Sequence, residues 1–192
     1  MNYKIDQADL ALLWKTGLSE KDIRHSILVA QKALDIAGRT GVDLDMKLVG
    51  RGALFHDLGK ALTHSFQHGE IGSELGEKLG LPPAITDIAR KHFHGGLSPD
   101  EAQELGLPDK DYTPRRIEER IIIYADRLVD IITDGYIKLQ DEHEAEERFE
   151  ELLTKHRKYG KDSPTRDRYI GYHREIQGLI GSPINKQAGG MK

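Results

Sequence analysis

The sequence of 192 residues contains no cysteine, which excludes disulfides, thiolate zinc ligands and a thiol nucleophile. No stretch approaches the roughly 20 consecutive apolar residues that a membrane-spanning helix needs. The first segment, MNYKIDQADLALLWK, has neither the basic region nor the apolar centre of a secretory signal. We therefore expect a cytoplasmic protein that does not associate with membranes.

An excess of positive charge is also lacking, because 28 lysines and arginines stand against 32 aspartates and glutamates and give a formal net charge of -4. Strong binding of nucleic acid through a basic surface is therefore not expected, although a small bound nucleotide is compatible with this charge. Hydrophobic residues make up 38% of the chain and charged residues 31%, which is typical of a globular protein. The length suits one domain with a sizeable core.

Capping residues and glycines divide the chain into successive helices. Ser19 is suited to cap a helix over residues 22–39. Asp43 or Asp45 opens a second helix, which we expect to end near Gly59. The first of these helices is amphipathic, with an apolar stripe formed by Ile23, Ile27, Ala30 and Leu34.

Three longer helical segments are predicted in the middle of the chain. Glycines are spaced along one side of residues 68–80, which indicates close approach to a neighbouring helix or a ligand. A Pro-Pro pair starts the next helix, which breaks at Gly95. Residues 115–135 are apolar on nearly every side between Ile121 and Ile132, so this helix should be buried centrally.

No alternating strand pattern, internal repeat or low-complexity block interrupts this series, so we predict an all-α, single-domain helical bundle. We divide it into an N-terminal helical extension (1–18), a metal-binding helical core (19–140), C-terminal helices packed on the core (141–182) and a flexible tail (183–192). The C-terminal helices would either cover a pocket or form the face of a homodimer, and composition favours neither.

A carboxylate within the central apolar helix needs a partner, because an unpaired buried charge is very costly. Asp126 beside Arg127 is compatible with a plain structural ion pair. The order of other polar residues changes the interpretation: His25 lies in the first long helix, and His56 and Asp57 end the second. Two imidazoles and two carboxylates from three helices form a mixed nitrogen–oxygen set suited to a divalent metal such as Mn, Fe, Co, Ni, Zn or Mg.

Two further histidines are placed to supply ligands for a second ion. His68 follows Asp57 by 11 residues (68 − 57), and His92 follows His68 by 24 (92 − 68). Asp57 would then bridge the two ions. Paired ions about 3.5–4 Å apart generate a hydroxide and clamp the oxygens of a phosphoryl group.

These motifs carry a family resemblance. The order His25, His56-Asp57, Asp126 resembles the HD-domain superfamily of metal-dependent phosphohydrolases, whose fold is a helical bundle. HDLGK is similar to the motif of the HDIG subgroup, with leucine in place of isoleucine. THSFQHGEIGSELGEKLGLP, KHFHGG and IIIYADRLVD resemble segments of small bacterial and archaeal HDIG proteins. The likeness runs from about residue 24 to residue 134.

The resemblance implies roles for individual residues. The defining metal ligands would be His25, His56, Asp57 and Asp126, and the extra ligands of two-metal members would be His68 and His92.

The chain reads HFH where many relatives have adjacent histidines, so His94 is an alternative to His92, and one ion or two stays open. Lys60 matches a lysine that often follows the motif and would neutralise Asp57 or contact a phosphate. His64 either faces the substrate, as a further catalytic residue beside Asp57 and Lys60, or is an exposed loop histidine.

The implied activity is hydrolysis of a phosphate ester or anhydride, in a nucleotide, by attack of a metal-bound hydroxide. An HD-type di-iron oxygenase and a non-catalytic metal- or nucleotide-binding module are the alternatives. Arg24 and Arg127 are assigned to structural ion pairs first and to phosphate binding second. Surface or packing roles are expected for the three C-terminal histidines, His143, His156 and His173.

Overall fold

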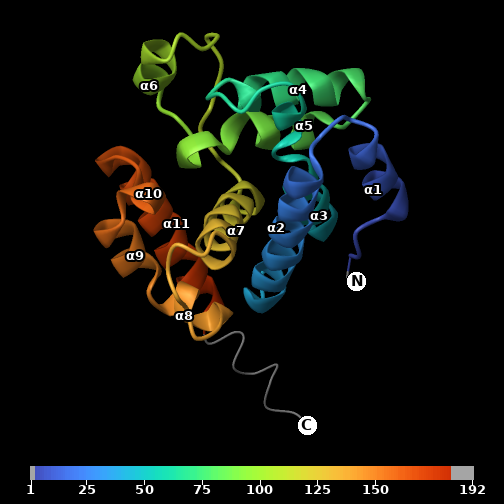
Figure 1. Ribbon diagram of the computed structural model, residues 1–192. Coiled ribbons are helices and arrows are strands. Elements are labelled where there is room, and N and C mark those ends of the chain that lie inside the picture. The colour runs from blue at the N-terminus through green and yellow to red at the C-terminus, as the bar shows by residue number, and fades with distance from the viewer. Residues whose placement is uncertain (1–2, 183–192) are drawn as a thin grey trace.

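The computed structural model describes residues 3–182, and all of its regular elements are helices (Figure 1). The predicted tail, residues 183–192, lies outside the described residues. No helix within residues 3–182 is long and apolar enough to cross a membrane. The elements in chain order are α1 (Gln7–Trp14), α2 (Glu20–Arg39), α3 (Met46–Phe55), η1 (Leu58–Ala61), α4 (His68–Lys78), α5 (Pro83–Lys91), η2 (Phe93–Gly95), α6 (Pro99–Glu104), α7 (Ile117–Thr133), α8 (Glu142–Glu147), α9 (Phe149–Lys155), α10 (Arg157–Gly160) and α11 (Ser163–Ile180).

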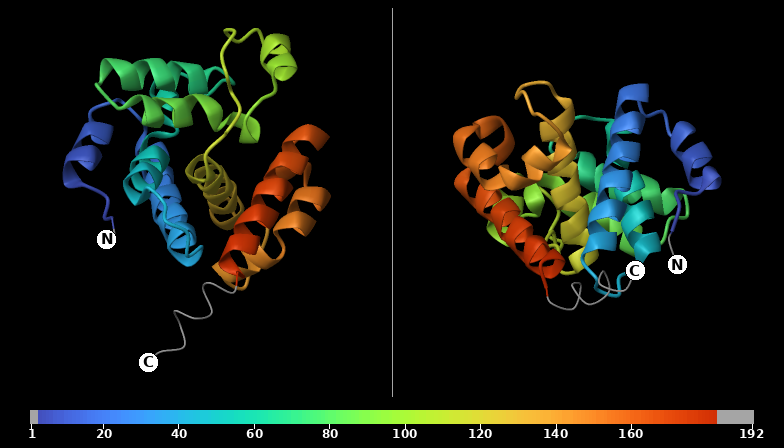
Figure 2. Two further views of the ribbon diagram at one scale, coloured as in Figure 1. Left: turned by 180° about the vertical axis from the view of Figure 1, so that it is seen from behind. Right: turned by 90° about the horizontal axis from the view of Figure 1, so that it is seen from below.

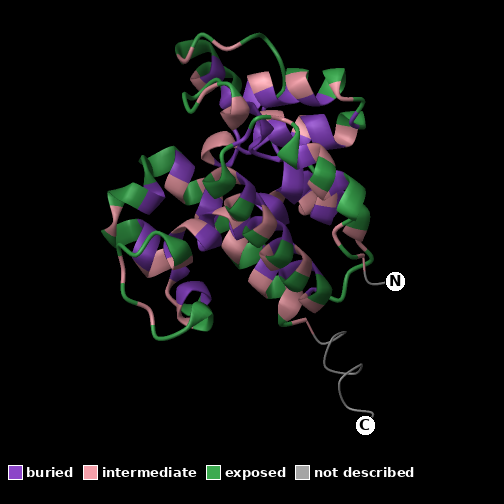
Figure 3. Cartoon of the chain, turned by 45° about the vertical axis from the view of Figure 1, so that its right-hand side comes forward, coloured by how far each residue is buried: buried purple, intermediate pink, exposed green. Residues whose placement is uncertain are grey.

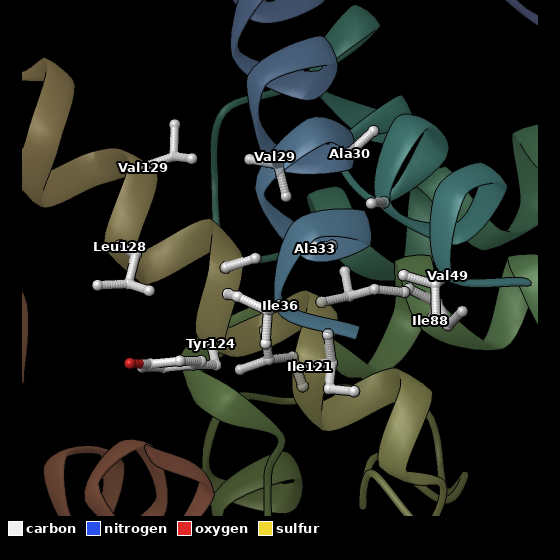
Figure 4. Close-up of a cluster of buried hydrophobic side chains, with 14 of the residues drawn as sticks. Val29, Ala30, Ala33, Ile36, Val49, Ile88, Ile121, Tyr124, Leu128 and Val129 are labelled. Atoms are coloured by element: carbon white, nitrogen blue, oxygen red, sulfur yellow. The ribbon is translucent and has the colours of Figure 1, made fainter. Parts of the chain in front are cut away.

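The core lies between α2, α3 and α7, and α5 packs against α3 at one end (Figure 4). As predicted, α7 is central and is buried on nearly every side. Each fully buried aliphatic side chain contributes about 1.5–3 kcal/mol relative to an exposed one. Completely buried members of this core include Val29, Ala33, Ile36, Val49, Ile121, Tyr124 and Leu128.

Side chains fix the starts of two helices that bring residues to the site. The Ser19 hydroxyl accepts a hydrogen bond from the backbone N–H of Asp22 at 3.1 Å and begins α2. The Asp45 carboxylate accepts one from Leu48 at 2.9 Å and begins α3. The end of α3 differs from the prediction: the helix ends at Phe55, and a 3-10 turn follows because the backbone of Asp57 departs from helical geometry (φ -95°, ψ 16°).

Helices α4 and α5 lie across the ends of α2, α3 and α7, which places several helix ends at one level (Figures 1 and 3). Their close approach depends on glycine. A Cβ on Gly59 would lie 1.9 Å from the backbone oxygen of His68, and one on Gly72 would lie 2.8 Å from the backbone nitrogen of Gly59. The glycine spacing predicted for residues 68–80 therefore serves packing against η1 and α5.

The C-terminal helices pack against α7 on the side away from α3 (Figure 2). Helix α11 also contacts η2, the short turn after α5. Tyr172 donates a hydrogen bond to the carbonyl oxygen of Gly95 at 2.8 Å, and Arg168 donates one to the carbonyl oxygen of His94 at 3.2 Å. A segment far away in the sequence therefore holds the backbone that follows His92.

We expect Gly59→Ala to destabilise the fold by several kcal/mol, because the added methyl group meets backbone that cannot move away as a flexible side chain would. Urea unfolding followed by circular dichroism measures the change. The control is Gly38→Ala, at an exposed helical position with nothing within 4 Å of the added Cβ. It should stabilise the protein by about 0.5–1 kcal/mol. Equal effects of the two substitutions would contradict this packing account.

Candidate metal centre

The structure brings the six predicted ligand residues together in one cluster. Three groups, formed by these residues and Asp130, place their ligand atoms within 4.8 Å of one another: His25 with His56 and Asp57, Asp57 with His68 and His92, and His25 with Asp126 and Asp130. The cluster thus draws on five elements, with His25 in α2, His56 and Asp57 after α3, His68 at the start of α4, His92 at the end of α5 and Asp126 in α7.

Three of the histidine rings are held in the same way. Nδ1 of His56 lies 2.7 Å from the carbonyl oxygen of Ala53, and Nδ1 of His68 and of His92 make equivalent contacts of 2.7 Å with the carbonyls three residues before them. A carbonyl only accepts, so each Nδ1 carries the proton and donates it. Each Nε2 is therefore the ring nitrogen that faces the cluster, which is how metal-binding histidines are commonly oriented.

The two oxygens of Asp57 face different halves of the cluster. Oδ2 lies 3.3 Å from Nε2 of His56 and 3.7 Å from Nε2 of His25. Oδ1 lies 3.2 Å from Nε2 of His92 and 3.5 Å from Nε2 of His68. Asp57 is only 1% exposed, so this division is fixed by the interior of the protein.

Asp126 completes the first half of the cluster. Its Oδ1 lies 2.9 Å from Nε2 of His25 and 3.5 Å from Nε2 of His56. The carboxylate is half-buried, and both histidines lower its pKa well below the usual range, against the opposing effect of burial. It is thus ionised and available to a cation.

The protonation of the histidines follows from these contacts. Burial alone would lower the pKa of His56, but Asp57 and Asp126 outweigh it and raise the pKa to about 10. Burial and the neighbouring His92 lower the pKa of His68 to about 4, so this ring is neutral at physiological pH. Burial opposes ionisation of Asp57, yet His56 and His92 hold its pKa well below the usual range.

Two features of this arrangement fit a bound cation. Nε2 of His56 is buried and makes no hydrogen bond within the described part of the chain. Nε2 of His68 and Nε2 of His92 lie 3.0 Å apart, although both rings already donate through Nδ1. Facing lone pairs need a proton or a positive ion between them, and neutral imidazoles with carboxylates suit a divalent transition metal.

A polar cavity of about 160 Å³ opens beside the cluster. A larger hollow of about 350 Å³ lies between α2, α7 and α8, but the described residues around it bring no three metal-ligating groups together. The smaller cavity is therefore the candidate functional site, and it is lined by Asp57, Lys60, His68, His92, Phe93, His94, Asp126, Arg127, Asp130, Lys161 and Tyr169.

Lys60 and His64 have different positions relative to this site. Nζ of Lys60 lies 2.5 Å from Oδ2 of Asp57 and lines the cavity. Burial opposes its charge, but Asp57 raises its pKa, so it is a cation. His64 is exposed, its Nε2 lies 3.3 Å from Asp22, and it does not line the cavity. The geometry thus supports the exposed-loop interpretation of His64 and gives no support to a substrate contact.

His92 and His94 are also distinguished. His92 faces Asp57 and His68, whereas His94 stacks on Phe93 with ring centroids 3.9 Å apart and belongs to none of the three ligand groups. His94 has a left-handed backbone (φ 52°, ψ 27°), which turns its side chain to another part of the cavity wall. The geometry therefore favours His92 as the ligand.

Arg24 and His173 make structural contacts away from the cavity, whereas Arg127 combines a structural contact with a place in the cavity wall. Arg24 pairs with Glu20 on the surface of α2. His173 forms a hydrogen bond of 2.9 Å between its Nδ1 and the Tyr124 hydroxyl and stacks on Phe149, which is a packing role. Arg127 does form the expected ion pair, with Asp130 at 2.9 Å, but it also lines the cavity.

Sequence reasoning did not identify Asp130, Lys161 and Tyr169 as residues of this site. Asp130 follows Asp126 by one helical turn, so it could have been found from the same helix face. Burial and the charge of Asp126 raise its pKa. No pattern in the sequence marks Tyr169, whose hydroxyl accepts a hydrogen bond from Arg127 at 2.8 Å. Lys161 comes from the turn between α10 and α11, where no local motif marks it.

Relatives that match most of this chain include an archaeal protein and part of a tRNA methyltransferase. The chain is 34% identical over 169 residues to an uncharacterized protein of Methanocaldococcus jannaschii, which covers 86% of this chain and 94% of that protein. It is 31% identical over 181 residues to a tRNA (cytidine(56)-2'-O)-methyltransferase of Thermoplasma volcanium. The match covers 94% of this chain but only 49% of that enzyme, so the chain spans about half the length of this relative.

A solved structure shares the fold. The HD domain of the phosphodiesterase PgpH of L. monocytogenes, crystallised in complex with cyclic-di-AMP, superimposes with a TM-score of 0.57. The sequences are 19% identical, and the match covers 97% of this chain and 99% of that one. Residues 22–131, which contain all six clustered ligand residues, match the HD domain family. The chain belongs to the HD domain family, as its ordered histidine and aspartate motifs predicted.

Proposed function

We propose that this protein is a phosphohydrolase that holds two divalent cations and cleaves a phosphodiester linkage between nucleotides. The observation that carries the proposal is the division of Asp57, whose two carboxylate oxygens each face a different pair of histidine Nε2 atoms. A single structural ion would need only one pair of histidines and one oxygen of Asp57. Two sets that share a carboxylate are typical of centres that act on phosphoryl groups.

The residues divide naturally between two ions. His25, His56 and Asp126 with Oδ2 of Asp57 would hold one, and His68 and His92 with Oδ1 of Asp57 would hold the other. Neither set fills a coordination sphere of six, so water and substrate oxygens can complete both. When bound, such ions lower the pKa of a coordinated water and polarise the phosphoryl oxygens.

Lys60 would change partner when cations bind. In the structure its ammonium group neutralises Asp57 at 2.5 Å. Cations at Asp57 would replace this contact and repel the ammonium group, whose four-carbon stem lets it turn into the cavity. There it would donate hydrogen bonds to a phosphate oxygen and stabilise the negative charge that develops as the ester bond breaks.

The proposed substrate class rests on the character of the cavity and on the structural relative. The cavity is small, open and polar, with cations along one wall, as a site for a phosphate group requires. The PgpH domain of the same fold binds cyclic-di-AMP and is named a phosphodiesterase. A linkage between two nucleotides is therefore the first substrate class to test here.

We expect Asp57→Asn to lower hydrolysis of bis(p-nitrophenyl) phosphate in the presence of Mn by at least about 100-fold, because the amide cannot bridge two cations. Release of p-nitrophenol measures the rate. Asp43→Asn, the same change at an exposed loop position, is the matched control and should retain full activity. Equal rates for the two variants would contradict the proposal. Two bound irons with no ester hydrolysis by the wild type would favour the oxygenase instead.

Cation binding should release at least one proton per chain, because His56 is protonated below its pKa of about 10 and must lose this proton to coordinate through Nε2. Titration calorimetry with Mn at about pH 7.5 should therefore give enthalpies that differ between Tris and phosphate-free HEPES buffers. The apparent affinity should rise at least about tenfold per pH unit in this range. Enthalpies independent of the buffer would show that His56 does not exchange its proton for the cation.

A further inference from the structure

One wall of the cavity consists of residues other than the six clustered ligand residues. It consists of His94, Arg127, Lys161 and Tyr169, and it combines η2, α7 and the C-terminal helices. Two of these residues share an unusual property. Among the described residues, His94 (φ 52°) and Lys161 (φ 60°) are the non-glycine residues with a left-handed backbone, and both line this one cavity. Strain of this kind persists where the surrounding structure enforces it, and it gathers at functional sites.

The surrounding structure does enforce both conformations. Helix α11 fixes His94 through the hydrogen bond from Arg168 to its carbonyl oxygen, and Arg168 itself pairs with Glu101 at 2.9 Å. At Lys161, the backbone N–H donates to the carbonyl oxygen of Arg157 at 2.8 Å. The preceding residue, Gly160, packs so closely that an added Cβ would lie 2.2 Å from the carbonyl oxygen of Leu153.

The turn at Lys161 would be less strained with glycine. Lys161 has ψ -105° together with its positive φ, a region that glycine occupies far more readily than a residue with a side chain. Lysine at this position therefore destabilises the fold relative to glycine. What lysine adds, compared with glycine, is a side chain that ends in an ammonium group.

The charge on this wall is positive. Asp130 neutralises Arg127 at 2.9 Å, and Tyr169 fixes the same guanidinium group. The ammonium group of Lys161 makes no hydrogen bond or ion pair with the residues that the structure describes. Partial burial, and secondly the charge of Arg127, lower the pKa of Lys161, whereas the charge of Asp130 raises it. Lys161 thus presents an ammonium group with no direct partner among the described residues, close to Arg127 and at the edge of a cavity whose other side is the ligand cluster.

We propose that Lys161, together with Arg127 and His94, forms a subsite for a second phosphate group of the substrate. This inference rests on the proposed function, since it places the phosphate to be cleaved at the ligand cluster and its neighbour at the wall. Lysine acts on phosphate as a mobile point charge, and beside it the buried Arg127 holds a fixed guanidinium group whose own charge is paired with Asp130. The substrate class is therefore a compound with two phosphates one linkage apart, joined either as an anhydride or through a nucleoside.

Two pairs of ligands test this subsite. The members of each pair differ by one phosphate, and the two pairs differ in how the two phosphates are linked. ADP with AMP represents the anhydride, and the dinucleotide pApA with ApA represents phosphates joined through a nucleoside. Affinities are measured by calorimetry on the full-length protein loaded with Mn. In the wild type, we expect the extra phosphate to tighten binding about tenfold in one pair, which identifies the linkage.

Lys161→Gln should remove most of this tenfold preference and leave AMP and ApA affinities within about twofold of the wild type. Lys155→Gln, the same change at an exposed lysine of α9, is the control and should keep the preference. A wild type without preference in either pair would overturn the proposal. So would a Lys161→Gln variant that retains the preference or weakens both members of a pair equally.

Lys161→Gly distinguishes binding from structure. Because glycine relieves the left-handed backbone, the thermal midpoint should stay level or rise, while the second-phosphate preference falls as far as in Lys161→Gln. A lower midpoint with an intact preference would assign Lys161 to the fold and overturn the subsite. Hydrolysis of bis(p-nitrophenyl) phosphate by the wild type is measured in parallel. Its absence would overturn the proposed hydrolase while the binding ratios still decide the subsite.

Discussion

The buried carboxylate of Asp57 is the constraint on which the rest of this structure depends. It lies within 3.7 Å of four histidine Nε2 atoms and within 2.5 Å of the Lys60 ammonium group. A buried charge without partners would be prohibitively costly, so the surrounding helices must place their histidines within reach of it. The arrangement of α2, α3, α4, α5 and α7 is thus also the arrangement of a ligand cluster.

The helix ends converge because the backbones approach unusually closely. Gly59 lets η1 meet the first turn of α4, where Nε2 of His68 lies 3.5 Å from Oδ1 of Asp57. The C-terminal helices complete the site from the other side, because α11 fixes the turn after His92 and the turn before α11 carries Lys161. Packing and site geometry therefore depend on the same few contacts.

Much of this could be predicted from the sequence, and the reasons for the failures are physical. Apolar periodicity and capping residues predicted the all-α fold, and the ordered HD motifs predicted which six side chains would meet. The expected end of the second helix near Gly59 was wrong: the helix ends at Phe55, and Gly59 instead makes room for the backbone of His68. Lys161 could not be predicted, because only the packing of α10 and α11 against α7 brings it to the cavity.

The metal content of the protein tests the central claim most directly. Elemental analysis after loading with Mn and removal of free ions should find two ions per chain in the wild type. It should find one in His68→Gln, because His25, His56 and Asp126 still form a site with Asp57, and neither ion should remain tightly bound in Asp57→Asn. A wild type with no bound ion, or an Asp57→Asn variant that keeps both ions, would contradict a centre bridged by Asp57.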